Sequence, residues 1–298
     1  MKVLSRAAAA AAVAAVALSP AAAVEWRTLE EVKSFVMERA GKRGAFAEVK
    51  ADEVRKILDN IKTLDRDEWA REWCKVGLEH EKHGDERARA GAPSKELAEI
   101  YHSAFAYCML GRYPVASSPG KREAYKHSVR QYRKAGPHLD PPLQVVEIPF
   151  EGKKLVGYLR IPKGVTKPPV VMNWGGVDGW KEDRERPNQR IMRQGMATFT
   201  VDLPGTGESP VLYGDPAAQR AYSAFIDHIV SRSDVDGSRI AVWGGSFGGY
   251  WAARMAYVEK DRLKGAVFQG GNVHIGYTRE WLRSEEHTSE LQSHHDLV

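Results

Sequence analysis

The apolar positions of this chain repeat with two different periods, and the change between them falls at Pro141-Pro142. Upstream of that pair, apolar residues recur every three or four positions, as they do along one face of an amphipathic helix. Such runs cover residues 29–36, 54–61, 69–78, 96–110 and 125–132. The pattern predicts a helical region over residues 24–140, in which the aromatic side chains pack between helices.

Downstream of Pro142 the pattern is that of strands. Residues 143–149 and 155–161 alternate between apolar and polar positions, which predicts an antiparallel pair joined by a turn. Further apolar runs at residues 170–172, 197–201, 240–243 and 266–268 alternate with helical stretches at residues 188–195, 217–230 and 249–256. This alternation predicts an α/β fold with a doubly wound, mostly parallel sheet over residues 141–282.

The N-terminus has the features of a secretory signal peptide over residues 1–23. Lys2 and Arg6 supply the positive charge, residues 7–18 are apolar, and Ala21-Ala22-Ala23 forms a small-residue cleavage site. The apolar run is too short for a membrane span. We therefore expect no stable membrane anchor, and a mature protein in the periplasm or outside the cell.

The C-terminal tail from Arg283 to Val298 has neither a helical nor a strand period. Residues 283–293 match, codon for codon, the translation of a common sequencing-library adapter. The natural sequence is therefore expected to break off near Leu282, with residues 283–298 as a non-native tail. The alternative interpretation is a polar, disordered tail.

Composition and charge narrow the class of function. The formal net charge of +5 comes from scattered Lys and Arg residues without a basic block rich in aromatics, so nucleic-acid binding is not expected. We interpret His80-Glu81-Lys82-His83 as a solvated helix face and expect no metal or other cofactor. Cys74 and Cys108 both lie in helical patterns, where either a disulfide or two buried free thiols would fit.

The candidate chemistry centres on Gly244-Gly245-Ser246-Phe247-Gly248. This G-x-S-x-G pentapeptide follows the apolar run at residues 240–243 and precedes the helical stretch at residues 249–256. A strand, a sharp turn and a helix are the setting that a nucleophile elbow requires, because the turn exposes the serine hydroxyl. We predict that Ser246 is a catalytic nucleophile; the alternative is an ordinary glycine-rich turn.

Such a serine needs amide donors for the oxyanion that forms on the substrate. One donor is the amide after the nucleophile, Phe247, and the other comes from the loop after the third strand. That loop reads Asn-Trp-Gly-Gly-Val-Asp-Gly-Trp at residues 173–180. We assign the second donor to Val177, with Gly176 as the alternative. Two tryptophans are candidates either to line an apolar pocket or to pack at its edge: Trp174 and Trp180.

A second glycine-rich loop occupies residues 202–209. It lacks the lysine that follows the last glycine of a phosphate-binding P-loop. Asp202 precedes Ser246, whereas the catalytic acid of this class of hydrolase follows the serine. We therefore interpret Asp202 as a structural residue. Two later side chains are candidates to face the pocket: Glu208 and Ser209.

Together these motifs resemble the α/β-hydrolase superfamily. A helical N-terminal region, then Gly-Tyr-Leu-Arg-Ile-Pro at residues 157–162 and Gln-Gly-Gly-Asn-Val-His at residues 269–274, is similar to the group containing dihydroxypseudooxynicotine hydrolase and the fermentation/respiration switch esterase. The resemblance spans residues 97–282. It implies a helical cap over the active site and metal-free hydrolysis of esters, or of carbon–carbon bonds in β-diketone-like substrates. The sequence departs at Asn173-Trp174, where many relatives have His-Gly.

In this superfamily an acid and then a histidine follow the nucleophile along the chain. Between Ser246 and Leu282 the sequence offers one histidine, His274, only one strand beyond the elbow. We expect His274 to line the pocket or to be structural rather than to act as the base. The acid and the base are expected downstream of residue 282, which would leave the 298-residue chain inactive.

The leading hypothesis is a serine hydrolase that acts on a small-molecule ester or related carbonyl substrate through an acyl-enzyme. One alternative is a peptidase of the prolyl-oligopeptidase type, although the N-terminal region is helical rather than a propeller. A carbon–carbon bond hydrolase and a non-catalytic binding protein with a hydrolase fold are the others.

Overall fold

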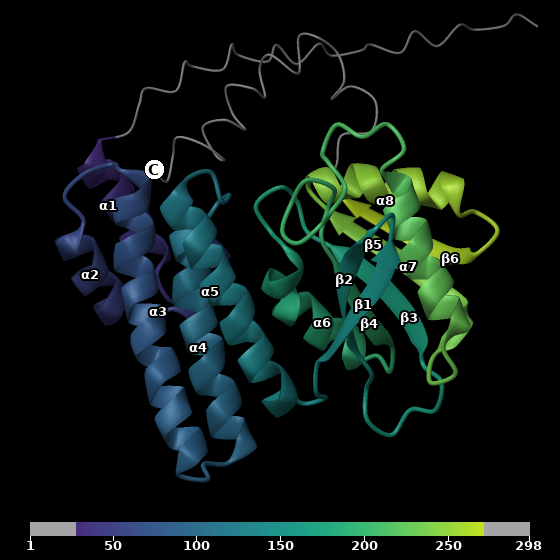
Figure 1. Ribbon diagram of the computed structural model, residues 1–298, viewed down its shortest axis with the longest axis horizontal. Coiled ribbons are helices and arrows are strands. Elements are labelled where there is room, and N and C mark those ends of the chain that lie inside the picture. The colour runs from purple at the N-terminus through teal and green to yellow at the C-terminus, as the bar shows by residue number, and fades with distance from the viewer. Residues whose placement is uncertain (1–27, 271–298) are drawn as a thin grey trace, which may run out of the picture.

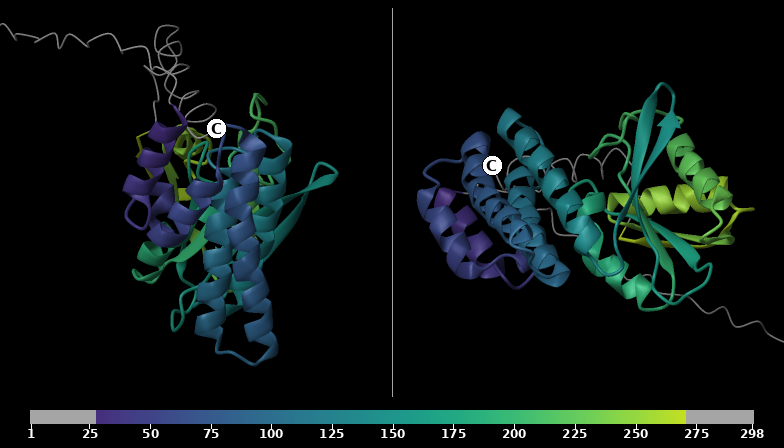
Figure 2. Two further views of the ribbon diagram at one scale, coloured as in Figure 1. Left: turned by 90° about the vertical axis from the view of Figure 1, so that its left-hand side faces the viewer. Right: turned by 60° about the horizontal axis from the view of Figure 1, so that its bottom comes forward.

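The computed structural model describes residues 28–270, which form two parts lying side by side (Figure 1). Helices α1 to α5 make one part, which we call the cap (residues 28–138), and a six-stranded sheet with helices α6 to α8 makes the other, the core. The right-hand view in Figure 2 shows the cap along one side of the core. The predicted signal peptide, His274 and the tail from Arg283 lie outside the described residues.

The cap helices begin where polar side chains can accept hydrogen bonds from the first backbone amides. Thr28, Asp65 and Ser118 do so for α1, α3 and α5. Within the described range, no helix has the length and apolar character needed to cross a bilayer. The cap elements are α1 Leu29–Arg39, η1 Gly44–Glu48, α2 Ala51–Asn60, α3 Arg66–Arg89, α4 Ser94–Arg112, α5 Pro119–Ala135 and η2 Gly136–His138.

Helices α3 and α4 approach each other closely because α3 has a glycine at the crossing. A Cβ on Gly77 would lie 2.7 Å from the carbonyl oxygen of Ala104 in α4. Beside this contact, Cys74 of α3 and Cys108 of α4 form a disulfide bond. The structure thus contains the disulfide rather than the two free thiols that the sequence also allowed.

The interpretation of residues 80–83 as a solvated helix face is wrong for Glu81. This residue is 6% exposed and accepts hydrogen bonds from Arg130 (2.6 and 2.9 Å) and Gln131 (3.1 Å) of α5. The ammonium of Lys134 lies 2.9 Å from the same carboxylate. Because α5 packs along this half of α3, a charged stretch of helix becomes an internal ion-pair site.

The predicted α/β class and mostly parallel sheet are confirmed by the strand order β1-β2-β4-β3-β5-β6. β2 is antiparallel to both of its neighbours, and the other pairs are parallel. The parallel strands therefore end at one edge of the sheet, where α/β proteins place their sites. The strands are β1 Gln144–Phe150, β2 Lys153–Arg160, β3 Pro169–Trp174, β4 Ala197–Val201, β5 Asp236–Gly245 and β6 Leu263–Gln269.

The core helices lie on both faces of this sheet. Figure 1 shows α6 (Glu185–Met192) on the side of the cap, with α7 (Gln219–Ser231) and α8 (Phe247–Val258) on the other. A short helix, η3 (Lys181–Arg184), precedes α6. The cap packs against the core through Val156 and Tyr158 of β2, which belong to the same apolar cluster as the cap aromatics. This contact places the cap beside the carboxyl ends of β3 and β4.

Candidate active site

Ser246 lies at the turn between β5 and α8, with φ of 52° and ψ of −131°. A positive φ is uncommon for a residue with a side chain, and surrounding contacts must hold it. Here the Ser246 amide donates to the carbonyl oxygen of Gln269 (2.8 Å), and the Ser246 carbonyl accepts from the Gly249 amide (2.7 Å). The residue is exposed. Strand, strained turn and helix together give the geometry of a nucleophile elbow.

The glycines of the elbow are required by close backbone contacts. A Cβ on Gly244 would overlap the carbonyl oxygen of Gly248, and a Cβ on Gly248 would overlap that of Gly175. The indole of Trp174 fixes this arrangement by donating a 2.7 Å hydrogen bond to the Gly248 carbonyl. Trp174 is completely buried. Of its two predicted roles, the structure therefore places Trp174 in packing beneath the elbow rather than on a pocket wall.

The loop after β3 lies directly against the nucleophile. A Cβ on Gly176 would lie 2.8 Å from Cβ and 3.0 Å from Oγ of Ser246. Among residues 28–270, the backbone amides of Gly176, Val177 and Phe247 donate no hydrogen bond. These are the three amides that the sequence suggested for the oxyanion. The structure sets Gly176 against the Ser246 side chain, and none of the three amides has a partner in the part of the chain that the structure describes.

Trp180 closes the other end of this loop. Its indole nitrogen donates to the carbonyl oxygen of Val177 (2.9 Å). One face of the ring lies 4.0 Å from the guanidinium carbon of Arg112, and the edge of Tyr125 approaches with ring centres 4.5 Å apart. Trp180 is 5% exposed. It therefore packs between cap and core and holds the shape of the loop.

Two consecutive cap residues bind the same loop. Arg112, the last residue of α4 and 1% exposed, donates to the carbonyl oxygens of Asp178 (2.7 Å) and Pro114 (2.8 Å) and pairs with Asp183. The hydroxyl of Tyr113 donates to the Asp178 carboxylate (3.1 Å). Burial, with the added effect of that carboxylate, raises the pKa of Tyr113, so this hydroxyl stays a neutral donor.

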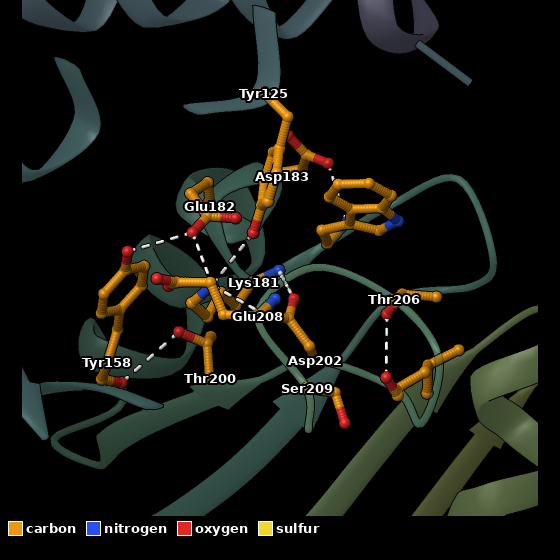
Figure 3. Close-up of polar contacts among 12 residues, drawn as sticks. Tyr125, Tyr158, Lys181, Glu182, Asp183, Thr200, Asp202, Thr206, Glu208 and Ser209 are labelled. Atoms are coloured by element: carbon orange, nitrogen blue, oxygen red, sulfur yellow. Dashed lines mark hydrogen bonds and ion pairs between the residues drawn. The ribbon is translucent and has the colours of Figure 1, made fainter. Parts of the chain in front are cut away.

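Lys181, the next residue after Trp180, is the centre of a buried ionic cluster (Figure 3). Its ammonium lies 2.7 Å from Glu182 and 2.8 Å from both Asp202 and Glu208. Asp202 also accepts from the backbone amides of Lys181 (3.0 Å) and Glu208 (2.9 Å). Asp202 thus ties the loop after β4 to the loop after β3, which is a structural role.

Comparison with known proteins shows the family of this chain. A family model described as Esterase FrsA-like matches residues 29–284. The chain belongs to the FrsA-like esterase family. It is 26% identical over 220 residues to Esterase FrsA of Vibrio vulnificus, covering 73% of this chain and 52% of that protein. It is 28% identical over 235 residues to 2,6-dihydropseudooxynicotine hydrolase of Paenarthrobacter nicotinovorans, covering 75% and 63%. The chain thus spans about half the length of the FrsA esterases it matches.

Solved structures show the same fold as this FrsA-like chain. The crystal structure of 2,6-dihydroxy-pseudo-oxynicotine hydrolase aligns with a TM-score of 0.67 and 24% identity, over 89% of this chain and 75% of that one. AbyA5 aligns with a TM-score of 0.65 and 23% identity, over 87% and 67%. The fold is therefore that of an α/β-hydrolase.

The part of this FrsA-like chain that the structure describes does not supply a base to Ser246. Within residues 28–270, Ser246 Oγ makes no hydrogen bond with any other residue. Two of the described histidines have partners elsewhere: His102 contacts Glu48 at 2.8 Å in the cap, and His228 contacts Arg232 at 3.5 Å on α7. In the same range, no three His, Cys, Asp or Glu side chains gather as a metal site.

Sequence reasoning missed the residues that support the loop. Arg112 and Tyr113 lie at the end of a helix whose sequence pattern indicates only packing. Lys181 opens the charged run Lys-Glu-Asp-Arg at residues 181–184, directly after the glycine loop. A charged run beside a predicted oxyanion loop is a signal that could have suggested buried ion pairs there.

Proposed function

We propose that this protein is a serine hydrolase in which Ser246 attacks the carbonyl carbon of a small-molecule ester or related substrate. The observation that carries the proposal is the contact between Gly176 and the side chain of Ser246. Ser246 itself is held at positive φ. This geometry brings the nucleophile and free amides to one point, as acyl transfer requires. Membership of the FrsA-like esterase family supports the ester class.

In the proposed reaction, Ser246 Oγ bonds to the carbonyl carbon while its proton passes to a base. The carbonyl oxygen becomes an oxyanion and accepts hydrogen bonds from the amide of Phe247 and that of Val177 or Gly176. Collapse of this intermediate expels the alcohol, which takes up the proton, and leaves an acyl group on Ser246. Water then attacks the acyl-enzyme and releases the acid.

The proposal places the catalytic base and its acid outside residues 28–270. His274 is the weaker candidate for the base, because it follows the elbow by a single strand. The stronger candidate is a histidine encoded by the genomic locus downstream of residue 282, in place of the adapter-like tail. On this proposal the 298-residue chain is inactive, and the protein in which genomic sequence replaces residues 283–298, here called the restored protein, is active.

Labelling with a fluorophosphonate probe tests this proposal. The restored protein should be labelled, and Ser246→Ala should abolish the labelling, whereas the 298-residue chain should stay unlabelled. Labelling that survives Ser246→Ala, or none in the restored protein, would contradict the nucleophile. A genomic stop codon after Val298, in reads free of adapter, would contradict the downstream base.

We also propose that the protein functions in the periplasm or outside the cell. The signal-like residues 1–23 support this, and so does the Cys74–Cys108 disulfide, because such bonds persist in oxidising compartments. Fractionation of cells should place the protein outside the cytoplasm. Thiol titration of the fractionated protein, denatured without reduction, should detect no free thiol. Detection of two free thiols would mean that Cys74 and Cys108 are not paired, and the disulfide would then not support this localisation.

A further inference from the structure

The indole of Trp174 lies where the end of β3, the end of β5 and the start of α8 meet. Trp174 is itself the last residue of β3, and the loop that follows it contacts Ser246 through Gly176. A Cβ on Gly244, in β5, would lie 2.7 Å from the indole Nε1, and a Cβ on Gly248, in α8, would lie 2.6 Å from its Cδ1. One side chain is thus packed against the segments on both sides of the nucleophile turn.

This indole also donates a hydrogen bond across the junction. Its Nε1 lies 2.7 Å from the carbonyl oxygen of Gly248, the residue that follows Phe247. The proposed oxyanion donors lie on the two sides of this bond: the amide of Phe247 in α8, and the amide of Gly176 or Val177 in the loop that begins after Trp174. Because a hydrogen bond has a preferred length and direction, this contact sets the spacing of the segments that carry the donors.

Neighbouring aromatic rings fix the indole in its position. The ring centre of Tyr222, in α7, lies 4.6 Å from that of Trp174, and Trp251, in α8, lies 5.5 Å from Tyr222 on the same measure. All three side chains are buried in one core cluster. Protein interiors are packed too densely for a side chain of this size to reorient freely. The Nε1 donor is therefore held in one place beneath the elbow.

Trp251 has the same kind of side chain without the same hydrogen bond. Its indole nitrogen is buried and has no hydrogen-bond partner in the part of the chain that the structure describes. Trp174 and Trp251 are both buried and both contact Tyr222. A packing role is therefore common to the two indoles, whereas a bond to the elbow belongs to Trp174.

We propose that Trp174 is a positioning residue, which aligns the amide donors on the two sides of Ser246 through its hydrogen bond to Gly248. An oxyanion is stabilised by donors that already point to it, so a change in their spacing lowers the rate at the transition state more than it weakens substrate binding. Trp174 is fully buried and takes no part in the covalent steps. The kinetic part of this inference rests on the proposed function, because it assumes that Ser246 attacks a carbonyl carbon.

Crystal structures of the 298-residue chain and of two variants test the positioning without any turnover. Trp174→Phe removes the indole N–H and keeps an aromatic ring in the core, and Trp251→Phe is the matched control. Trp174→Phe should change the distance between the amide nitrogens of Phe247 and Gly176 by ~0.5 Å or more, which is the tolerance of a preorganised site. Trp251→Phe should leave that distance unchanged. An unchanged distance in Trp174→Phe, or an equal change in both variants, would overturn the proposal.

A second variant serves if the smaller ring of Trp174→Phe prevents folding. Replacement of Trp174 by 3-benzothienylalanine puts a sulfur atom where the indole has its N–H, so the shape of the ring is kept and only the donor is lost. The same change in the distance between the two amide nitrogens is expected. An unchanged distance in this variant would also overturn the proposal.

Kinetics of the restored protein measure the effect on the transition state. Each variant is assayed with a simple ester and with the matching thionoester, whose sulfur accepts hydrogen bonds only weakly. Trp174→Phe should lower kcat for the ester ~10-fold or more with KM within ~2-fold, and it should lower kcat for the thionoester less. Trp251→Phe should keep the parental ratio of the two kcat values. A structural defect lowers the amount of active enzyme and reduces both rates equally, so equal losses in Trp174→Phe would contradict positioning.

The crystal structures and fluorophosphonate labelling separate this inference from the proposed function. If Trp174→Phe displaces the amides but Ser246 of the restored protein is not labelled, the hydrolase proposal fails and Trp174 still positions the turn. If Ser246 is labelled but Trp174→Phe neither displaces the amides nor changes the ratio of the kcat values, only the role of Trp174 is wrong.

Discussion

The guanidinium of Arg112 in the cap donates a 2.7 Å hydrogen bond to the backbone carbonyl of Asp178 in the core. Asp178 belongs to the loop that sets Gly176 against Ser246. A buried guanidinium makes directional, charge-assisted hydrogen bonds, so this contact fixes where the loop lies. The cap therefore contacts the loop that carries the proposed oxyanion donors, and it does more than cover the site.

The first prediction concerns the substitution Arg112→Lys. Lysine keeps the charge but loses the fork that reaches Asp178, Pro114 and Asp183 together, and it loses the flat stack on Trp180. In the restored protein we expect kcat for a simple ester to fall ~10- to 100-fold with little change in KM, because a loop displaced by about 1 Å misplaces its donors.

Steady-state kinetics of Arg112→Lys and of a matched control variant measure the predicted fall in kcat. Arg133→Lys changes another cap arginine that pairs with the core, through Glu208, without touching the loop after β3. That variant should retain kcat within ~3-fold, as expected for a partly exposed ion pair. Equal losses of kcat in the two variants would show that kcat depends on the cap–core interface as a whole and not on Arg112 in particular.

The second prediction concerns Gly176→Ala. The new Cβ would lie 2.8 Å from Cβ and 3.0 Å from Oγ of Ser246, so either the nucleophile or the loop must move. We expect the rate of fluorophosphonate labelling of the restored protein to fall ~100-fold. Gly179→Ala is the control in the same loop, since the nearest atoms to its Cβ would be 3.9 Å away. Normal labelling of Gly176→Ala would show that the loop does not contribute to catalysis.

Much of the fold was accessible from sequence because its signals are local. Alternating and apolar runs predicted each of the six strands, and the elbow was recognised from the strand and helix around Ser246. Helix α3 was harder. Its second half carries few large apolar residues, and it is buried through Gly77, Glu81 and Gly84 instead. Periodicity counts apolar side chains, so it does not register a helix that packs through glycines and paired charges.

The site was predictable only where one segment encodes it. The elbow and the glycine loop are each continuous in sequence, so Ser246 and Gly176 could be named. Contacts such as Arg112 with Asp178 join residues 66 positions apart, and they arise from how the cap docks on the core. Trp174 shows the same limit, because sequence cannot distinguish an indole on a pocket wall from one buried under the elbow.

The third prediction is that Lys181→Met strongly destabilises the protein. Lys181 is fully buried among Glu182, Asp202 and Glu208, so its removal leaves carboxylates buried without their shared cation. We expect the free energy of unfolding to fall by about 3–5 kcal/mol. Lys126→Met removes a lysine whose side chain is 71% exposed, and it should change stability by less than ~1 kcal/mol.

Urea denaturation of the two lysine variants at neutral pH measures the difference. A Lys181→Met protein as stable as the parent would mean that the three carboxylates take up protons at little cost. In that case the stability of the variant should fall steeply as the pH is raised, which a second denaturation series would show.

The last prediction concerns the pH dependence of stability through Glu81. Burial opposes its ionisation, but hydrogen bonds from Arg130, Lys134 and Gln131 outweigh this and lower its pKa from 4.5 to about 2. A carboxylate with a depressed pKa in the folded state stabilises the protein above its unfolded pKa, and this stabilisation is lost as the pH falls from about 4.5 to 2. Glu81→Gln should therefore lower the free energy of unfolding at pH 7 by about 1–3 kcal/mol. Its stability should also decline less than that of the parent between pH 5 and pH 3. Parallel declines in the two proteins, measured by urea denaturation across this range, would show that Glu81 is not ion-paired in solution.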